Sequence, residues 1–179
     1  MSSPADVIAT YIRAKDGNRP HLMAAAFAES AVLEMVVKSG AISFPERTIG
    51  LASIEDVLVR RFAQTFENVY TFCLAIPPVG LHAFQCDWLV CMSEKASASV
   101  RVGCGSYDWQ FSGTDPCIAQ RLVITIEQME VLPATALATV MQWVSRLPYP
   151  WCSPQQAAAS APDLAPSTVL AFLRRPPKN

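Results

Sequence analysis

The chain has 179 residues, of which 51% are hydrophobic and 16% are charged, and its formal net charge is −1. This length predicts one domain with an appendage, and the scattered Lys and Arg residues argue against nucleic acid and anionic membranes as partners. No segment has 18 uninterrupted apolar residues and the N-terminus lacks the basic start of a secretory signal, so neither a transmembrane helix nor export is predicted and a cytoplasmic location is expected by elimination.

Two helices are expected at the N-terminus. Apolar residues recur with helical spacing over residues 4–15, and Tyr11 lies on this apolar stripe. The sequence Asp-Gly-Asn at 16–18 ends the first helix, and Pro20 opens a second one whose apolar residues run to Phe27.

Two strands and a third helix are expected next. Alternation over residues 31–37 predicts a strand with Leu33 and Met35 on one face and Glu34 on the other, and residues 41–44 predict a short second strand. After Gly50, Ser53 is the expected N-cap of a helix that buries Phe62.

Four strand-like runs follow, at residues 69–76, 84–92, 99–111 and 119–132. Successive strands with short breaks indicate antiparallel pairing, and helices that precede strands indicate an α+β fold. Gly103 and Gly105 predict a bulge that helps the sheet to curve.

The composition changes after residue 132, because eight of the 14 prolines fall within residues 133–179. We therefore divide the chain into a domain of residues 1–132 and a C-terminal helical extension of residues 133–179. A helix over 135–146 carries a stripe that is expected to dock by its apolar side chains, which are Leu137, Val140, Met141 and Val144. A last short helix is expected over 168–175, with Ser167 as its cap.

Helix, break, helix and strand over residues 11–36, with a small-acid-small-apolar entry at residues 28–31, resemble the opening of the nuclear transport factor 2-like superfamily. Within it, the likeness is to the ketosteroid isomerase and SnoaL-like polyketide cyclase branch. The resemblance covers residues 4–132 and implies a cone-shaped, cystatin-like, curved antiparallel sheet with three N-terminal helices in its concavity. We call this concavity the cup.

The resemblance also assigns roles. It implies that Tyr11 is the oxyanion-binding tyrosine of the first helix, and that Glu34 matches a glutamate that precedes the catalytic aspartate. Met35 occupies the position of that aspartate, so the usual base is missing. Tyr107 matches an acid that shares the oxyanion hole.

The candidate catalytic residues are therefore Tyr11 and Tyr107, because phenols can donate hydrogen bonds to a developing oxyanion. The alternative is that both rings are core packing, with Tyr107 part of an aromatic ladder on its strand. Candidate ligand-binding residues are apolar or aromatic side chains expected in the cup, namely Phe27, Met35, Phe62, Trp88 and Trp109.

Other chemistry is weakly indicated. Asp87 and Asp108 are expected to face away from the cup unless their strands are bulged, and the six cysteines contain no C-x-x-C pair. We expect buried free thiols, no metal site and no cofactor.

The sequence thus predicts binding of a small apolar or aromatic molecule in the cup, with isomerase, cyclase or dehydratase chemistry without the aspartate base as an open question. The alternative is a non-catalytic dimerisation or protein-interaction module of the same fold. Leu89 and Cys91 oppose Trp88 and Val90 on their strand, so both sheet faces need cover and a homodimer through the convex face is expected.

Overall fold

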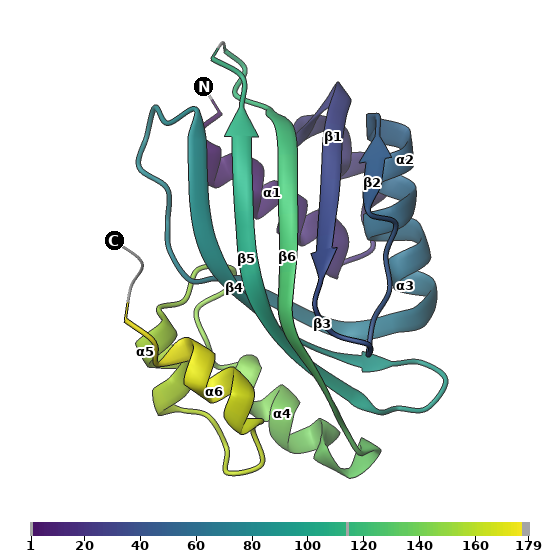
Figure 1. Cartoon of the computed structure of the whole chain (residues 1–179), viewed down its shortest axis with the longest axis vertical. Coiled ribbons are helices and arrows are strands. Elements are labelled where there is room, and N and C mark those ends of the chain that lie inside the picture. Colours follow the sequence, from purple (N-terminus) through teal and green to yellow (C-terminus); the bar gives the residue numbers. More distant parts are fainter. Residues whose placement is uncertain (1, 114, 177–179) are drawn as a thin grey trace.

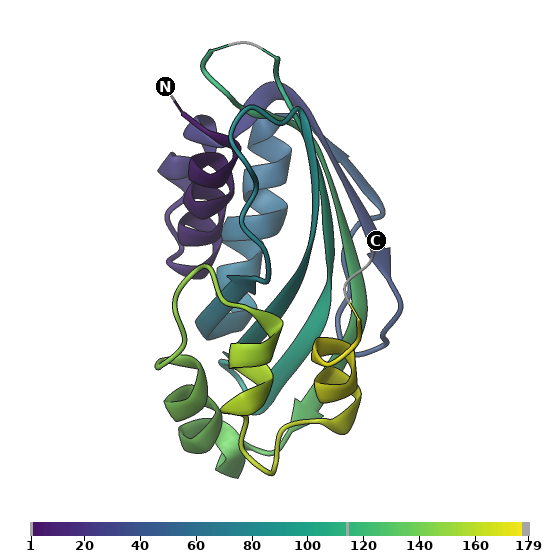
Figure 2. The same ribbon diagram turned by 90° about the vertical axis from the view of Figure 1, so that its left-hand side faces the viewer.

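The computed structural model describes residues 2–113 and 115–176. It has an α+β architecture in which the N-terminal helices cover one face of a single sheet and the C-terminal helices lie at one end of it (Figures 1 and 2). The strands are β1 (Phe27–Val37), β2 (Arg47–Ile49), β3 (Phe66–Cys73), β4 (Ala83–Glu94), β5 (Val100–Phe111) and β6 (Ala119–Leu132). The N-terminal helical elements are α1 (Pro4–Asp16), η1 (Pro20–Ala25), α2 (Leu51–Glu55), η2 (Asp56–Arg61) and α3 (Phe62–Thr65).

The six strands form one curved, unclosed sheet in the order β2-β1-β6-β5-β4-β3. Four of the neighbouring pairs are antiparallel, whereas β1 and β6 pair in parallel. Figure 2 shows α1 and the α2–α3 segment on the concave side of the sheet. The predicted α+β fold with helices in the concavity is therefore confirmed, and the parallel pair is the one departure from antiparallel order.

Local predictions fail in three places before β3. The second helix is a 3-10 helix that ends at Ala25, and Phe27 already belongs to β1. The expected strand at 41–44 is irregular, and β2 lies at Arg47–Ile49. Gly50, with φ of 91°, precedes α2, and Ser53 lies inside that helix instead of capping it. Only glycine adopts this φ readily, so Gly50 sets the helix start.

The expected irregularity at Gly103 and Gly105 is confirmed. Between Cys104 and Gly105 the register of β5 against β6 shifts by one residue. A Cβ on Gly105 would overlap the carbonyl oxygen of Thr125 and lie 2.6 Å from Cζ2 of Trp88. Trp88 is thus the side chain that covers the bare backbone here, on the face of the sheet that forms the cup.

The extension packs against the outer face of the sheet. It consists of η3 (Ala134–Ala136), α4 (Leu137–Val144), α5 (Pro154–Ala159) and α6 (Ser167–Leu173), gathered at the end of the sheet away from the N-terminus (Figure 1). Val140 and Val144 are fully buried, and Leu137 and Met141 are partly buried, so the predicted docking of this stripe is confirmed.

The α5 helix was not predicted, because its run of alanines lacks a periodic stripe. Ser153 begins it with a capping box, in which Ser153 and Gln156 exchange hydrogen bonds with each other's backbone N–H. Conversely, Ser167 does not cap α6, whose N-cap is Pro166. Among the described residues, no helix is long and apolar enough to cross a membrane.

The extension also pairs with the edge of β3 at its last residue, Cys73. The backbone N–H of Cys73 donates to the carbonyl of Pro150 at 2.8 Å, and the N–H of Cys152 donates to the carbonyl of Cys73 at 3.1 Å. β6 ends at Leu132, the residue after which the composition changes, while the division into two units stays a prediction.

Part of the surface expected to form a homodimer is covered by the C-terminal extension of the same chain. Leu89 and Cys91, which motivated a homodimer through the convex face, are fully buried in a cluster with side chains of the extension, including Val140 and Trp143. The extension therefore supplies the cover that this part of the sheet needs, and the homodimer stays a prediction.

Candidate functional site

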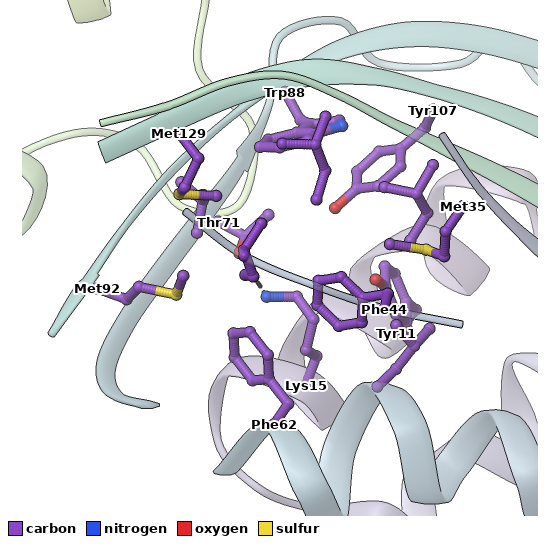
Figure 3. A pocket seen from close by; sticks show the side chains of 15 residues that line it. Tyr11, Lys15, Met35, Phe44, Phe62, Thr71, Trp88, Met92, Tyr107 and Met129 are labelled. Atoms are coloured by element: carbon purple, nitrogen blue, oxygen red, sulfur yellow. Dashed lines mark hydrogen bonds between the residues drawn. The ribbon is translucent and has the colours of Figure 1, made fainter. Parts of the chain in front are cut away.

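The cup contains a small apolar cavity between α1, the α2–α3 segment and the inner face of the sheet (Figure 3). Its volume is about 50 Å³. That is room for a few water molecules or a ligand of about four heavy atoms, and it is below the roughly 300–1,000 Å³ of pockets that enclose drug-sized molecules. The side chains around it are Tyr11, Lys15, Met35, Ile42, Phe44, Leu58, Phe62, Thr71, Trp88, Val90, Met92, Tyr107, Ile124, Ile126 and Met129.

Tyr11 enters the cavity from α1, where its place on the apolar stripe directs it toward the sheet. The residue is 0% exposed, and its hydroxyl oxygen has no hydrogen-bond partner among the described residues. A buried polar group without a partner costs free energy, roughly 1–3 kcal/mol. The hydroxyl makes no well-formed hydrogen bond with a described residue. Burial raises its pKa, and the Tyr107 phenol lies close enough to lower that pKa in part.

Tyr107 reaches the same cavity from β5. Its ring meets that of Tyr11 edge-on, with centroids 6.1 Å apart, and both phenol oxygens point into the cavity (Figure 3). Tyr107 lies close enough to influence the pKa of Tyr11, yet Tyr11 Oη completes no hydrogen bond of ordinary geometry. The structure thus brings together the two phenols that the sequence singled out.

The five predicted ligand-binding residues divide into two groups. Met35, Phe62 and Trp88 line the cavity, and the buried indole N–H of Trp88 has no partner among the residues that the structure describes. Phe27 and Trp109 do not line it; their rings pack against that of Tyr11 at centroid distances of 5.7 and 5.4 Å. That any of the five contacts a ligand stays a prediction.

The carboxylates considered as substitute bases lie outside the cup. Glu34 accepts a hydrogen bond from Arg121 Nε at 3.0 Å on the outer face of the sheet. Asp87 pairs with Arg175 of the extension at 2.6 Å, and Asp108 accepts from Gln85. Asp87 and Asp108 both line a separate groove between the outer face and the extension. None of the three carboxylates lines the cavity.

Sequence analysis missed a buried charged cluster at the cavity wall. Lys15 Nζ donates to Asp16 Oδ1 at 2.7 Å and to Thr71 Oγ1 at 2.8 Å, and it lies 4.8 Å from the centroid of the Phe62 ring. Lys15 is four residues after Tyr11, so both side chains share one face of α1. That spacing is the signal in the sequence from which Lys15 could have been predicted at the cavity.

The irregular segment 38–46 was also missed as part of the site. Residues 41–44 were expected to form a strand, but the segment is irregular and brings Ile42 and Phe44 against the cavity. In Figure 3, Phe44 lies between Lys15 and Tyr11. These two side chains restrict the volume of the cavity.

Comparison with known proteins agrees with this architecture. No protein-family model and no curated protein sequence matches the chain. Among solved structures, a nuclear transport factor 2-like superfamily protein from Salmonella enterica has a TM-score of 0.57 at 13% identity, covering 69% of this chain and 88% of its own. The chain has the nuclear transport factor 2-like fold.

The names of two other structures with this fold state an enzyme activity or a bound molecule. A hexachlorocyclohexane dehydrochlorinase, LinA type 2, has a TM-score of 0.53 at 12% identity and covers 71% of this chain and 84% of its own. A protein with a ketosteroid isomerase-like fold from Catenulispora acidiphila, in complex with trimethylamine, has a TM-score of 0.53 at 14% identity. The match covers 69% of this chain and 85% of that protein. At such identities the likeness establishes the nuclear transport factor 2-like fold alone.

The thiols of the chain are free and mostly buried, as predicted. Five of the six cysteines are buried and Cys117 is partly exposed. Within residues 2–113 and 115–176, no cluster of three or more His, Cys, Asp or Glu side chains is placed to hold a metal ion.

We expect the two cavity phenols to stay protonated at pH values where free tyrosine ionises. Burial is the main cause that raises the pKa of Tyr11 and of Tyr107 above 10.0. Ultraviolet titration of phenolate absorbance should therefore show that at least two of the four tyrosines resist ionisation at pH 11 in the folded protein.

The same shifts predict how stability varies with pH. Above pH 10 the unfolded chain loses phenol protons that the folded chain retains, so the free energy of unfolding should fall as the pH rises. Titration in concentrated denaturant is the control and should ionise all four near pH 10. Full phenolate absorbance of the folded protein at pH 11 would contradict the buried positions.

Proposed function

We propose that this protein binds a small, largely apolar molecule in the cup, with a hydrogen-bond acceptor of the ligand held by Tyr11 and Tyr107. The observation that carries the proposal is the fully buried Tyr11 hydroxyl, which has no partner among the described residues and faces an apolar cavity. Apolar walls with few convergent polar groups are typical of ligand pockets. A dehydrochlorinase and a trimethylamine complex among structures of this fold are in keeping with small molecules as its ligands.

The size of the cavity restricts this proposal. About 50 Å³ admits a ligand of about four heavy atoms, and a ring compound would have to displace Ile42 and Phe44 on segment 38–46. The alternative function, a non-catalytic dimerisation module, has less support, because the apolar residues that suggested it lie under the extension. A cytoplasmic location remains a prediction as well.

The proposal is tested with acetamide, whose four heavy atoms suit the cavity and whose carbonyl oxygen is the acceptor, titrated at neutral pH by calorimetry. We expect binding, and we expect Tyr11→Phe to weaken it by about 1–3 kcal/mol, because the variant keeps the ring but loses the donor. Tyr70→Phe is the matched control, since Tyr70 packs with the extension on the outer face. Equal affinities of the wild type and Tyr11→Phe would contradict a donor role for Tyr11.

We also expect no ketosteroid-type isomerase activity. Met35 cannot shuttle a proton between carbon atoms, and a positioned general base typically contributes about 10²–10⁴-fold to the rate. Asp16, the carboxylate nearest the cavity wall, is fully engaged by Lys15, Thr71 and Tyr149. The absorbance of a conjugated enone product gives the measurement. Met35→Asp should add weak proton transfer, and appreciable turnover by the unmodified protein would refute this expectation.

A further inference from the structure

Lys15 is the most unusual group at the cavity wall, because its ammonium is buried. Its side chain is 8% exposed, it belongs to α1 like Tyr11, and it lines the cavity. A lysine ammonium has three donors. Among the described residues, two oxygen acceptors are found for it, on Asp16 and Thr71. One N–H is therefore left without an oxygen or nitrogen acceptor, beside the ring of Phe62.

The partner of Lys15 is fully engaged in holding it. Asp16 Oδ1 accepts from Lys15 Nζ and from Thr71 Oγ1, and Oδ2 accepts from the backbone N–H of Thr71 at 2.7 Å and from the hydroxyl of Tyr149 at 3.1 Å. Four accepted hydrogen bonds occupy the lone-pair positions of a carboxylate. Asp16 does not line the cavity, so the polar groups that meet the cavity space are mainly donors.

The donors reach the cavity from two elements. Tyr11 and Lys15 come from α1, and Tyr107 comes from β5. The cavity contains no carboxylate, and the hydroxyl of Thr71 is engaged with Lys15 and Asp16. A buried anion requires both hydrogen bonds and a nearby positive charge, and this set supplies both.

We propose that the ligand of the cup is a small carboxylate, that Lys15 is its cationic contact, and that Tyr149 in the C-terminal extension is a positioning residue that holds Lys15 in place through Asp16. This inference rests on the proposed function, because it names the ligand class of the same cavity. It also gives the extension a part in the site. Tyr149 precedes the segment that hydrogen-bonds to Cys73 at the end of β3, and its ring packs edge-on against Tyr70 and Phe72.

Acetate and acetamide are the probes, because they have the same number of heavy atoms and nearly the same shape but differ in charge. Three cavity residues are methionines, Met35, Met92 and Met129, so methyl resonances of carbon-13-labelled methionine report binding directly. We expect acetate to shift these resonances with a dissociation constant at least about tenfold lower than that of acetamide at pH 7 and constant ionic strength.

Variants separate the charge from the packing. Lys15→Met should abolish the preference for acetate while acetamide still binds, and Tyr149→Phe should reduce the preference several-fold without changing acetamide binding. Lys38→Met is the control, since Lys38 is half-exposed and pairs with Glu127 on the surface. If Lys15→Met fails to fold, Tyr149→Phe together with the acetate-to-acetamide ratio of the wild type still decides the question.

The outcomes distinguish the two proposals. Equal affinities for acetate and acetamide would overturn the carboxylate inference and leave the binding function intact. Absence of any shift of the cavity methionines with either probe would overturn both. An acetate preference that is unchanged in Lys15→Met would overturn the role of Lys15, and one that is unchanged in Tyr149→Phe would overturn the role of the extension.

Discussion

Gly105→Ala should lower the free energy of unfolding by at least about 3 kcal/mol, at the upper end of what overpacking causes. An added Cβ would overlap the carbonyl oxygen of Thr125 and lie 2.6 Å from Trp88. The first obstacle is backbone of the neighbouring strand, which cannot turn away as a side chain can. The second is an indole ring that lines the cavity, so the near-ultraviolet circular dichroism of tryptophan should change as well.

Two other glycines give a graded control for this prediction. A Cβ on Gly40 would meet nothing within 4 Å, so Gly40→Ala should be neutral or stabilise by up to about 1 kcal/mol. A Cβ on Gly103 would meet mainly the flexible end of Met129, at 2.5 Å. The stability of Gly103→Ala should therefore lie between those of Gly105→Ala and Gly40→Ala. Urea unfolding followed by tryptophan fluorescence measures all three. A Gly105→Ala protein as stable as Gly40→Ala would contradict the close strand packing.

Trp143→Ala should destabilise the protein by about 3–5 kcal/mol. Trp143 is 5% exposed in the cluster that joins α4 to the outer face of the sheet, and its indole N–H donates to the carbonyl of Ala157 in α5 at 3.2 Å. The substitution removes a large apolar side chain and leaves a buried carbonyl with one donor fewer. Because it loosens two helices of the extension together, proteolysis within residues 145–166 should accelerate.

The neighbouring residue in the same helix supplies the control for Trp143. Gln142 is exposed, so Gln142→Ala should change the free energy of unfolding by no more than about 0.5 kcal/mol. Denaturant unfolding of both variants gives the comparison. We expect the extension and the sheet to unfold in one cooperative transition. Release of the extension in Trp143→Ala while the sheet keeps its stability would contradict this expectation.

Most elements of the fold could be predicted because each has a local cause. The apolar stripe of α1, the alternation around Met35 and the long strand runs depend on residues close in sequence, and the structure bears them out. The predictions failed for elements with weak local patterns. Segment 41–44 has apolar residues but pairs with no strand, and α5 is built from alanines that have high helix propensity without a stripe. The parallel pairing of β1 with β6 is a long-range property that no local pattern contains.

The candidate site was predicted in part for the same reason. Tyr11 and Met35 follow from a periodic helix and a regular strand, so their direction into the cup could be read from spacing. The cluster of Lys15, Asp16 and Thr71 joins the end of a helix to a strand 55 residues later in the chain, and its fourth member, Tyr149, is 133 residues away. Separations of this kind are set by the packing of the whole molecule, and only the structure displays them.

The two edge strands of the sheet, β2 and β3, affect how readily the protein aggregates at high concentration. A free edge strand presents unpaired N–H and C=O groups on which another chain can add a strand, and this is how many β-sheet proteins begin to aggregate. Here one margin is the three-residue β2, and the other, at Cys73, is already hydrogen-bonded to residues 150–152. We therefore expect the extension to hinder strand addition at this end of β3, and we expect chains shortened before Pro150 to aggregate more readily.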